Sequence, residues 1–369
     1  MKVLICGPEP SLKGGVTIWM KLVLDYFDTN ANQQLQVEHL QIKRSATLTH
    51  MLPIYKKLYY AIKDYSRGYW ALRNELKRAK YDVVHIVSSA GLGILRDWLF
   101  VRLAKRYHSA TVVHYHCGTI PQHLQSGGVL RYMLRKVIQI SDKVAVLDEA
   151  SLKSINNEGC YNAVKIGNPY NPVIDEIVKH KHKRDSSTLL FVGHVVPAKG
   201  IRELLQAICD IPNVILKCIG PENYQFKEEL MAYVIGNNLS DRVMFFGLRP
   251  SIEIYTEMSR ATMFVLPTYT EGFPFVIVEA MACGCPIIST PVGAIKEMLS
   301  IDGRTQGNLV LPRDVRGLRD AILHNMTYPE ESLEAARHAQ HKAKMEYSLE
   351  SVMSQLVAIW FSVKTKEMS

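Results

Sequence analysis

Residues 271–293 read EGFPFVIVEAMACGCPIISTPVG, and the other parts of the chain are interpreted from this segment. An apolar run at 261–267 precedes it and Pro274 favours the start of a helix, so residues 271–273 form an elbow between a strand and a helix. The first amides of a helix have no partners within the helix, and they favour an anion. The segment therefore predicts an anion site at the carboxyl end of a strand.

Two carboxylates lie eight positions apart in this segment, Glu271 in the elbow and Glu279 in the helix. Whether both carboxylates face one cavity depends on the conformation of the elbow. We interpret that cavity as the candidate active site. The small residues Ala280, Ala282 and Gly284 allow the helix to pack closely on the sheet. The alternative is an ordinary strand, elbow and amphipathic helix, in which the two glutamates have no function.

The full string resembles the signature of the retaining GT-B glycosyltransferases of family four: Glu, seven residues, Glu, then Ala, Met, a small residue, Cys or Tyr, Gly, any residue and Pro. The resemblance is strongest to members that assemble bacterial capsular, exopolysaccharide or lipopolysaccharide sugars. It implies that Glu271 lies near the donor sugar and that Glu279 binds the ribose hydroxyls of the nucleotide. The family often has Gly where this chain has Pro274, which removes one amide from the elbow. Phe275 and Val276 then have to supply the amides that face the donor phosphates.

The composition is that of a globular protein with enough apolar residues for two domains. The chain has 369 residues, 47% of them hydrophobic, and no apolar run as long as a membrane span. Residues 2–6 are too short an apolar run for a signal peptide, so we expect a cytoplasmic protein. Seven cysteines without Cys-x-x-Cys pairs favour reduced thiols over a zinc site or a disulfide framework. Cys283 and Cys285 are interpreted as small packing residues.

A glycine pair follows the first expected strand. Residues 2–6 predict a buried strand, and Gly14 and Gly15 end the loop before an amphipathic helix. The spacing Gly-x-Gly-x-x-Gly is absent, which argues against a dinucleotide oxidoreductase. A plain tight turn explains the pair as well. The family resemblance implies a function, because it places such a pair near the donor diphosphate.

A strand expected at 111–116 brings His116 to its carboxyl end, where α/β proteins bind ligands. A lone histidine at such a place is also compatible with a structural role. The family resemblance covers a His-x-His at this strand and implies that one histidine lies close to the donor and acceptor sugars. Between His114 and His116 we favour His116, because it is nearer the loop.

In the second half of the chain, as in the first, segments that predict strands alternate with segments that predict helices. A strand at 188–192 is followed by a loop and by Lys199, and this string resembles the family's Val-Gly-Arg and Lys-Gly segments. The resemblance places Lys199 on the donor phosphate and His194 where arginine is usual. A neutral imidazole cannot replace a guanidinium fork, although a protonated one binds phosphate. The loops that end the units 214–220 and 243–247 hold the nucleotide base, by the same resemblance.

The excess positive charge is concentrated in residues 43–80. This stretch carries ten of the lysines and arginines against two acids, Asp64 and Glu75, whereas the whole chain has a net charge of +9. Such a local excess points to an anionic partner. The stretch also carries six aromatic residues, which are Tyr55, Tyr59, Tyr60, Tyr65, Tyr69 and Trp70.

We expect residues 43–80 to dock on an anionic membrane surface, since cations and amphipathic rings suit the headgroup layer. Apolar positions recur there at roughly helical spacing, although Pro53 makes one unbroken helix doubtful; they are Leu48, Leu52, Tyr55, Tyr59 and Ile62. One alternative is a solvated basic face whose aromatic residues pack on the first domain. A nucleic-acid or scaffold protein is the other, and it leaves residues 271–293 unexplained.

The resemblance implies an α/β protein with the GT-B fold, in which two Rossmann-like, doubly wound domains face each other. We place an acceptor-binding domain at 1–175, a nucleotide-sugar-binding domain at 176–348, and a helix at 349–369 that packs back on the first domain. The polar run at 179–187 marks the boundary between the domains. His180 and His182 in this run are interpreted as solvated, because the neighbouring lysines repel a metal ion.

The expected reaction is transfer of a sugar from a nucleotide-diphosphate donor to a glycan hydroxyl, with retention implied by the resemblance. No Asp-x-Asp occurs in the sequence, so neither a bridging metal nor another cofactor is expected. Lys199, the elbow amides, Gly14 and Gly15 then stabilise the leaving diphosphate. We expect a polyprenyl-linked glycan as acceptor, no nucleic-acid partner, and a peripheral position on the inner face of the cytoplasmic membrane. A nucleotide-sugar epimerase of the same fold is the alternative enzyme.

Overall fold

The computed structural model describes residues 1–10, 14–30, 34–43, 53–180 and 182–364. The chain forms two compact units, one of Met1–Gly167 together with Val352–Ser369 and one of Asn168–Ser351. The first unit therefore contains both the beginning and the end of the chain.

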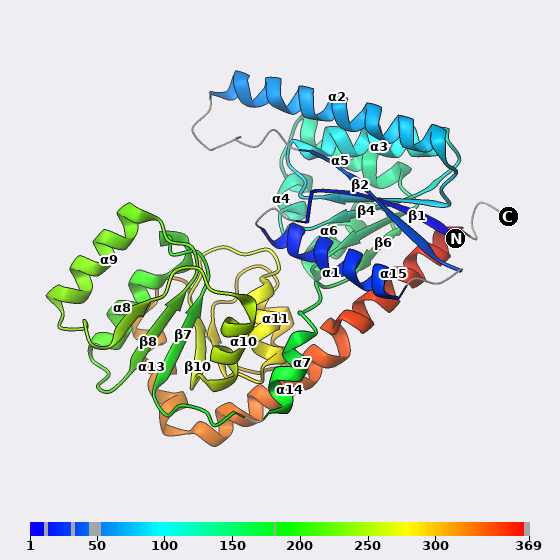
Figure 1. Cartoon of the computed structure of the whole chain (residues 1–369). Helices are drawn as coiled ribbons and strands as arrows, with labels where there is room; N and C mark the ends of the chain where they lie inside the picture. The colour runs from blue at the N-terminus through cyan, green and yellow to red at the C-terminus, as the bar shows by residue number, and fades with distance from the viewer. Residues whose placement is uncertain (11–13, 31–33, 44–52, 181, 365–369) are drawn as a thin grey trace. The chain divides into compact units, whose positions relative to one another are not determined.

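Within the described residues, the first unit has a six-stranded parallel sheet with the order β2-β1-β3-β4-β5-β6 (Figure 1). Its strands are β1 (Lys2–Gly7), β2 (Gln36–Gln41), β3 (Val83–Ser88), β4 (Ala110–Tyr115), β5 (Lys143–Val146) and β6 (Ala163–Lys165). Every residue of β3 and β4 is buried, as is typical of parallel strands that helices cover on both faces. The strand order reverses between β1 and β3, so the loops after these strands border a crevice.

The helices of the first unit enclose two apolar layers, one on each face of the sheet. They are α1 (Gly15–Thr29), α2 (Ile54–Arg78), α3 (Gly93–Arg106), α4 (Ile120–Gln125), α5 (Val129–Ile140), α6 (Glu149–Asn157) and α15 (Leu349–Lys364). Leu72 of α2 and Phe100 of α3 belong to one layer. In the other, Trp19 of α1 and Trp360 of α15 each lie 5.8 Å from the ring of His85 on β3. The C-terminal helix thus completes the core of the first unit.

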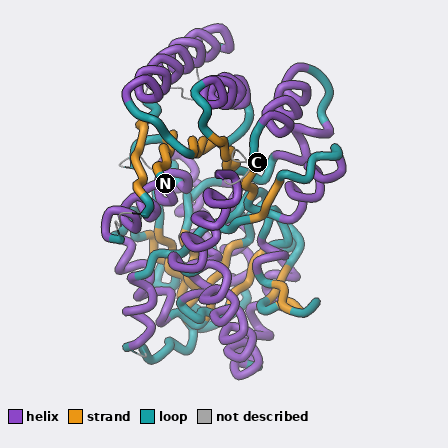
Figure 2. The backbone as a smooth tube through the Cα atoms, turned by 90° about the vertical axis from the view of Figure 1, so that its right-hand side faces the viewer, coloured by secondary structure: helices purple, strands orange, loops and turns teal. Residues whose placement is uncertain are grey.

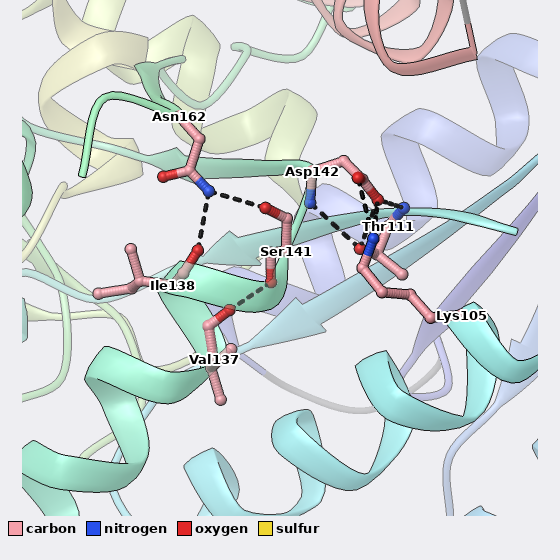
Figure 3. A network of polar contacts seen from close by, with 7 residues as sticks. All are labelled: Lys105, Thr111, Val137, Ile138, Ser141, Asp142 and Asn162. Carbon is pink, nitrogen blue, oxygen red and sulfur yellow. Dashed lines mark hydrogen bonds and ion pairs between the residues drawn. The ribbon is translucent and has the colours of Figure 1, made fainter. Parts of the chain in front are cut away.

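A polar network fixes the amino ends of the strands in the first unit (Figure 3). The carboxylate of Asp142, just before β5, accepts from the amide and hydroxyl of Thr111 at 2.7 and 2.9 Å and from Lys105 Nζ at 2.9 Å. The Asn162 side chain donates to two carbonyl oxygens at the end of α5, both at 2.8 Å. These bonds pair backbone groups at the amino edge of the sheet. The opposite, carboxyl edge is the one at which α/β sheets generally bind ligands.

The second unit has its own parallel sheet, six-stranded among the described residues, with the order β14-β11-β10-β7-β8-β9. Its strands are β7 (Thr188–Val192), β8 (Ile215–Ile219), β9 (Val243–Phe245), β10 (Met263–Leu266), β11 (Ile287–Ser289) and β14 (Asn308–Leu309), and β12 (Ser300–Ile301) and β13 (Arg304–Thr305) form a separate hairpin. The strand order reverses between β7 and β10. Open α/β sheets bind ligands outside the carboxyl ends of the strands at such a reversal.

Helices flank this second sheet as well, and Figure 2 shows the strands of each unit in orange between purple helices. They are α7 (Val173–Lys179), α8 (Ile201–Cys209), α9 (Tyr224–Gly236), α10 (Ser251–Arg260), α11 (Phe275–Ala282), α12 (Ile295–Met298), α13 (Val315–Thr327) and α14 (Pro329–Tyr347). Helix α7 packs on α10 and α11. The Tyr170 hydroxyl donates to Asp175 at 3.0 Å, and the Tyr170 amide donates to the Tyr347 carbonyl at 2.9 Å. These contacts place α7 in the second unit, whereas the sequence suggests a division after residue 175.

Both sheets confirm the doubly wound α/β architecture expected from the sequence. Aspartate is a residue type that favours N-caps, and Asp148 caps α6 by accepting the Ser151 amide at 2.7 Å. Two details differ from what the sequence predicts. It predicts the last strand of the first sheet at 165–167, and the structure has this strand at Ala163–Lys165. Pro53 is the N-cap of α2, so it precedes that helix instead of interrupting it. Arg44, Leu48 and Leu52 lie outside the described residues.

Candidate functional site

The loops after β7 and β10 meet at the reversal of strand order in the second unit. Lys199 ends the 3-10 turn η1 (Pro197–Lys199) after β7, and Glu271 lies in the elbow after β10. Lys199 Nζ is 2.5 Å from Glu271 Oε1, and the two side chains are 23% and 13% exposed. The structure therefore joins two of the residues predicted from the sequence in one partly buried ion pair.

Glycines allow the loops at this edge to touch backbone to backbone. Gly200 has φ 69°, and a Cβ there would lie 2.0 Å from the carbonyl oxygen of Pro267. Gly293 has φ 56°, and its Cβ would lie 2.3 Å from the carbonyl oxygen of Glu271. Since any other side chain clashes with a backbone atom, these positions require glycine. Gly293 ends the 271–293 segment, but the sequence does not predict its contact with the elbow.

The start of α11 supplies amides to the same edge. Pro274 is the N-cap and α11 begins at Phe275, so the amides of Phe275 and Val276 precede the first hydrogen bond within the helix. Both residues are half-buried. Their position fits the sequence-based hypothesis that they replace the amide that Pro274 lacks.

Glu279 lies one turn further along α11 and is buried. The Tyr255 hydroxyl donates to Glu279 Oε1 at 2.9 Å, and burial raises the pKa of the Glu279 carboxyl to about 7. Among the described residues, Glu279 makes no direct contact with Lys199 or Glu271. Tyr255, on α10, is a partner that the sequence did not reveal, because its distance along the chain gives no sign of the contact.

A pocket of about 380 Å³ opens at the ends of β8 and β9 and along the first half of α10. Its lining residues combine apolar and charged side chains and are Ile219, Phe246, Arg249, Ile252, Glu253, Thr256 and Glu257. Gly220, at the edge of β8, has φ 145°, and its Cβ would lie 2.0 Å from the carbonyl oxygen of Gly193, so the loops after β7 and β8 are in backbone contact. An apolar pocket with a few polar groups suits a flat heterocycle. The pocket lies at the loops that the sequence assigned to the nucleotide base.

His194 lies in the loop after β7. The residue is exposed, and its carbonyl oxygen accepts the Val196 amide at 2.9 Å. Its imidazole has no hydrogen-bond partner in the part of the chain that the structure describes. The side chain is therefore accessible to a ligand, and it does not take part in the ion pair of Lys199 and Glu271.

In the first unit, Gly14 and Gly15 begin α1. Gly14 is the N-cap, with φ 144°, and its carbonyl oxygen accepts the Thr17 hydroxyl at 2.7 Å and the Ile18 amide at 3.1 Å. Both glycines are exposed. The pair thus lies at the start of a helix that follows β1, as the sequence predicts.

His116 directly follows β4 and is half-buried. Its amide donates to the Ser88 carbonyl oxygen at 2.7 Å, and its ring lies 4.7 Å from Trp19 and 4.0 Å from His114. His114 is fully buried, whereas His116 is half-buried and keeps both of its ring nitrogens buried. The choice of His116 for contact with a ligand stays a prediction.

Two further imidazoles lie behind His116. Trp360 Nε1 donates to His85 Nδ1 at 3.1 Å, and the His85 and His114 rings are 5.5 Å apart. Burial lowers the pKa of His85 to about 3 and that of His114 well below its usual range. We refer to His85, His114, His116 and Trp19 as the imidazole cluster. Sequence reasoning missed His85 as a member, because its position in a buried strand indicated only packing.

The described residues contain no group of three or more histidine, cysteine, aspartate or glutamate side chains that could hold a metal ion. No helix among them is long and apolar enough to cross a membrane.

Comparison with protein families matches residues 173–342 to the model "Glycosyl transferases group 1". An uncharacterized glycosyltransferase of Methanocaldococcus jannaschii is 33% identical over 193 residues, 52% of each chain. A lipopolysaccharide core biosynthesis mannosyltransferase of Rhizobium leguminosarum bv. viciae is 29% identical over 49% of each chain. The chain thus spans about half the length of these curated relatives. Over a longer stretch, it is 25% identical to an N-acetyl-alpha-D-glucosaminyl L-malate synthase of Bacillus anthracis, covering 78% of this chain and 76% of that protein.

Solved structures resemble the chain over nearly its whole length. Sucrose-phosphate synthase from Thermosynechococcus elongatus has a TM-score of 0.77 at 19% identity and covers 98% of this chain and 99% of its own. An Anabaena protein in complex with UDP-glucose has a TM-score of 0.68 at 17% identity, covering 98% of this chain and all of its own. These likenesses show that the chain has the GT-B fold, as the sequence predicts.

Proposed function

We propose that the protein is a glycosyltransferase that moves a sugar from a nucleotide-diphosphate donor to a glycan hydroxyl. The observation that carries the proposal is the ion pair of Lys199 and Glu271 at the reversal of strand order, inside the segment that matches the glycosyltransferase model. A cation and helix amides at one sheet edge suit a diphosphate, and a carboxylate beside them suits a sugar.

In the proposed mechanism, the donor diphosphate lies against Lys199 and the amides of Phe275 and Val276. As the bond to the sugar breaks, negative charge grows on the diphosphate, and the lysine and the amides stabilise it. Glu271, released from its bond to Lys199, then faces the donor sugar. We assign no protein nucleophile, and we propose front-face attack with retention and without a metal or another cofactor.

The nucleoside of the donor is proposed to extend from Glu279 to the pocket at the ends of β8 and β9. The ribose hydroxyls donate to the Glu279 carboxylate, which Tyr255 holds in place. His194 contacts phosphate when protonated, and Gly14 and Gly15 approach the diphosphate. The Anabaena neighbour was solved with UDP-glucose, which supports a nucleotide sugar as donor.

The acceptor is proposed to be a polyprenyl-linked glycan of cell-surface polysaccharide biosynthesis, reached at the inner face of the cytoplasmic membrane. The mannosyltransferase of lipopolysaccharide core biosynthesis among the relatives supports this pathway class. His116 is the residue of the first unit that we place beside the sugars.

A thermal-shift screen of nucleotide sugars tests the donor, because a ligand that binds the folded state raises the melting temperature, and at equal concentration a tighter ligand raises it more. We expect selective stabilisation by one nucleotide sugar and loss of that stabilisation in Glu279→Ala. Product analysis with and without a lipid-linked glycan then separates transfer from epimerisation. A changed nucleotide sugar formed without acceptor would assign an epimerase instead.

A further inference from the structure

Helix α2 has 25 residues and lies along the outside of the first unit (Figure 1). The inward positions recur at intervals of three or four and are Ala61, Asp64, Gly68, Leu72 and Leu76. They pack towards α3, where the Phe100 ring would lie 3.0 Å from a Cβ at Gly68. The helix is thus held along one line, and its opposite side faces solvent.

The solvent side of α2 carries large apolar side chains. Tyr55, Tyr59, Ile62 and Trp70 are 66, 62, 58 and 55% exposed. Their spacing of three, four and eight residues puts them on one stripe of the helix. Tyr60, Tyr65 and Tyr69 are instead half-buried, so half of the aromatic residues in this region pack on the unit and half point away from it.

Cations flank this apolar stripe. Lys56, Lys63, Arg67 and Lys77 are exposed on the same outward side. The two acids of α2 are not exposed on this side: Asp64 is buried and lies 4.0 Å from Arg67, and Glu75 accepts hydrogen bonds from Tyr81 and Arg78. The outward side of α2 therefore shows cations and aromatic rings and, among its described side chains, no carboxylate. We call it the α2 outer face, defined by Tyr55, Lys56, Tyr59, Ile62, Lys63, Arg67, Trp70 and Lys77.

We propose that the α2 outer face lies flat on an anionic lipid surface, with the helix axis parallel to the membrane. Tyrosine and tryptophan rings favour the headgroup level, and lysines and arginines beside them attract anionic lipids. A helix that carries both on one side binds in the interface without crossing it. The apolar stripe and the cations then lie at different depths in the membrane. The headgroup layer receives the stripe of Tyr55, Tyr59, Ile62 and Trp70, and the flanking cations contact lipid phosphates. The proposal depends only on α2, so it stands apart from the chemistry of the second unit.

The first test compares binding to vesicles of phosphatidylcholine with and without phosphatidylglycerol, at low and high salt. The variant carries Lys56→Glu, Lys63→Glu and Arg67→Glu. Its matched control carries Arg304→Glu, Arg316→Glu and Lys344→Glu, which are exposed cations of the second unit and change the net charge equally. We expect the native chain and the control to pellet with anionic vesicles at low salt, and the α2 variant to bind at least about 100-fold more weakly. Equal pelleting of variant and control overturns the proposal.

The second test uses Trp70 as a depth probe. Of the four tryptophans, Trp19 and Trp360 are fully buried and Trp98 is half-buried, whereas Trp70 is more than half exposed. Anionic vesicles should shift the fluorescence emission of the native chain to shorter wavelength, and the shift should be lost in Trp70→Phe while pelleting persists. An undiminished shift in Trp70→Phe contradicts the assigned orientation. The double variant Tyr55→Ser, Tyr59→Ser should still bind anionic vesicles at low salt. At high salt it should lose the residual binding that the native chain keeps.

Two other occupants of the α2 outer face give different results. A second copy of the chain would give a dimer in light scattering that the charge variant abolishes, without vesicle binding. A nucleic acid would give salt-dependent binding to random duplex and no emission shift with lipid. Either result in place of vesicle binding overturns the proposal. Circular dichroism and melting temperature, measured on every variant, show whether a loss of binding reflects a loss of folding.

Discussion

At the carboxyl edge of the second sheet an ion pair joins Lys199 to Glu271, whereas the corresponding edge of the first sheet ends in the imidazole cluster around His116. The first arrangement is charged and partly open to water. The second is aromatic, and its inner imidazoles are kept neutral by burial. A diphosphate requires cations and free amides, and a sugar ring accepts aromatic surfaces and neutral polar groups. The difference supports assigning the donor phosphates to the second unit and the acceptor to the first.

The largest expected effect tests the charged edge. Lys199→Ala should lower kcat by about 100- to 1,000-fold, the range for loss of one electrostatic group at a developing charge, and Lys199→Arg should lower it less. Lys2→Ala is a matched control, because Lys2 also forms a partly buried ion pair, with Glu38 at 2.7 Å, at the amino end of the first sheet and outside the proposed site. Steady-state kinetics of the three variants provides the measurement. Equal, small effects of both Lys199 substitutions would make this residue a surface lysine.

The next effect concerns the nucleotide. Glu279→Ala should weaken nucleotide binding at least about tenfold, because a hydrogen bond to a charged acceptor contributes about 1.5 to 3 kcal/mol. Since the pKa of Glu279 is raised to about 7 and the ribose hydroxyls need the carboxylate, affinity should rise as the pH increases through 7. Calorimetry between pH 6 and 8 checks both points. Glu279→Gln should give a flat profile, and unchanged affinity in Glu279→Ala would refute the assignment.

A smaller effect tests the aromatic edge. His116→Ala should reduce transfer by about tenfold, the effect of losing one ordinary hydrogen bond, while nucleotide affinity stays nearly intact. The measurement compares kcat for transfer with the dissociation constant of the nucleotide. If the variant unfolds or melts far lower, His116 has a structural role.

The last effect concerns stability against pH instead of catalysis, and it has opposite signs in the two units. The folded-state pKa of His85 is lowered from 6.5 to about 3, so unfolding takes up a proton and the first unit loses stability as the pH falls from 6.5 towards 3. The pKa of Glu279 is raised from 4.5 to about 7, so its contribution to the second unit's stability increases as the pH falls from 7 to 4.5.

His114→Leu tests a second contribution of the same sign as that of His85, because burial also lowers the pKa of His114 and its ring nitrogens have no hydrogen-bond partner among the described residues. Burial of the neutral His85 changes the free energy of unfolding by about 1.4 kcal/mol per pH unit in its window, and buried His114 adds a contribution of the same sign. The variant should therefore resist acid better than the native chain when the fluorescence of the buried Trp19 and Trp360 is followed. An identical acid transition in variant and native chain contradicts the assigned burial of a neutral His114.

The sequence was sufficient for features that depend on neighbouring residues. Apolar runs of strand length located the parallel strands, and the string from Glu271 to Glu279 located the elbow and the helix that follows it. Asp148 as an N-cap is equally local, because the capped amide lies three residues away.

Features that depend on distant residues could not be predicted. The bonds from Tyr255 to Glu279 and from Trp360 to His85 join elements far apart in the chain, and no spacing rule indicates them. The close approach of Gly200 to Pro267 is of the same kind, since the Lys-Gly pair shows that glycine is present but not which carbonyl it meets. Three-dimensional packing, not local propensity, decides these contacts.

The position of Trp360 also bears on how the protein is made. A ribosome releases the first unit's strands early in synthesis, but the tryptophan that bonds to His85 follows the whole second unit in the sequence. The second unit, Asn168–Ser351, is complete before that residue is added. The first unit to be translated is therefore the last to acquire its finished core, and until then the apolar face beneath α15 is exposed to chaperones. A premature stop after residue 348 would leave out α15 and would thereby damage the domain encoded first.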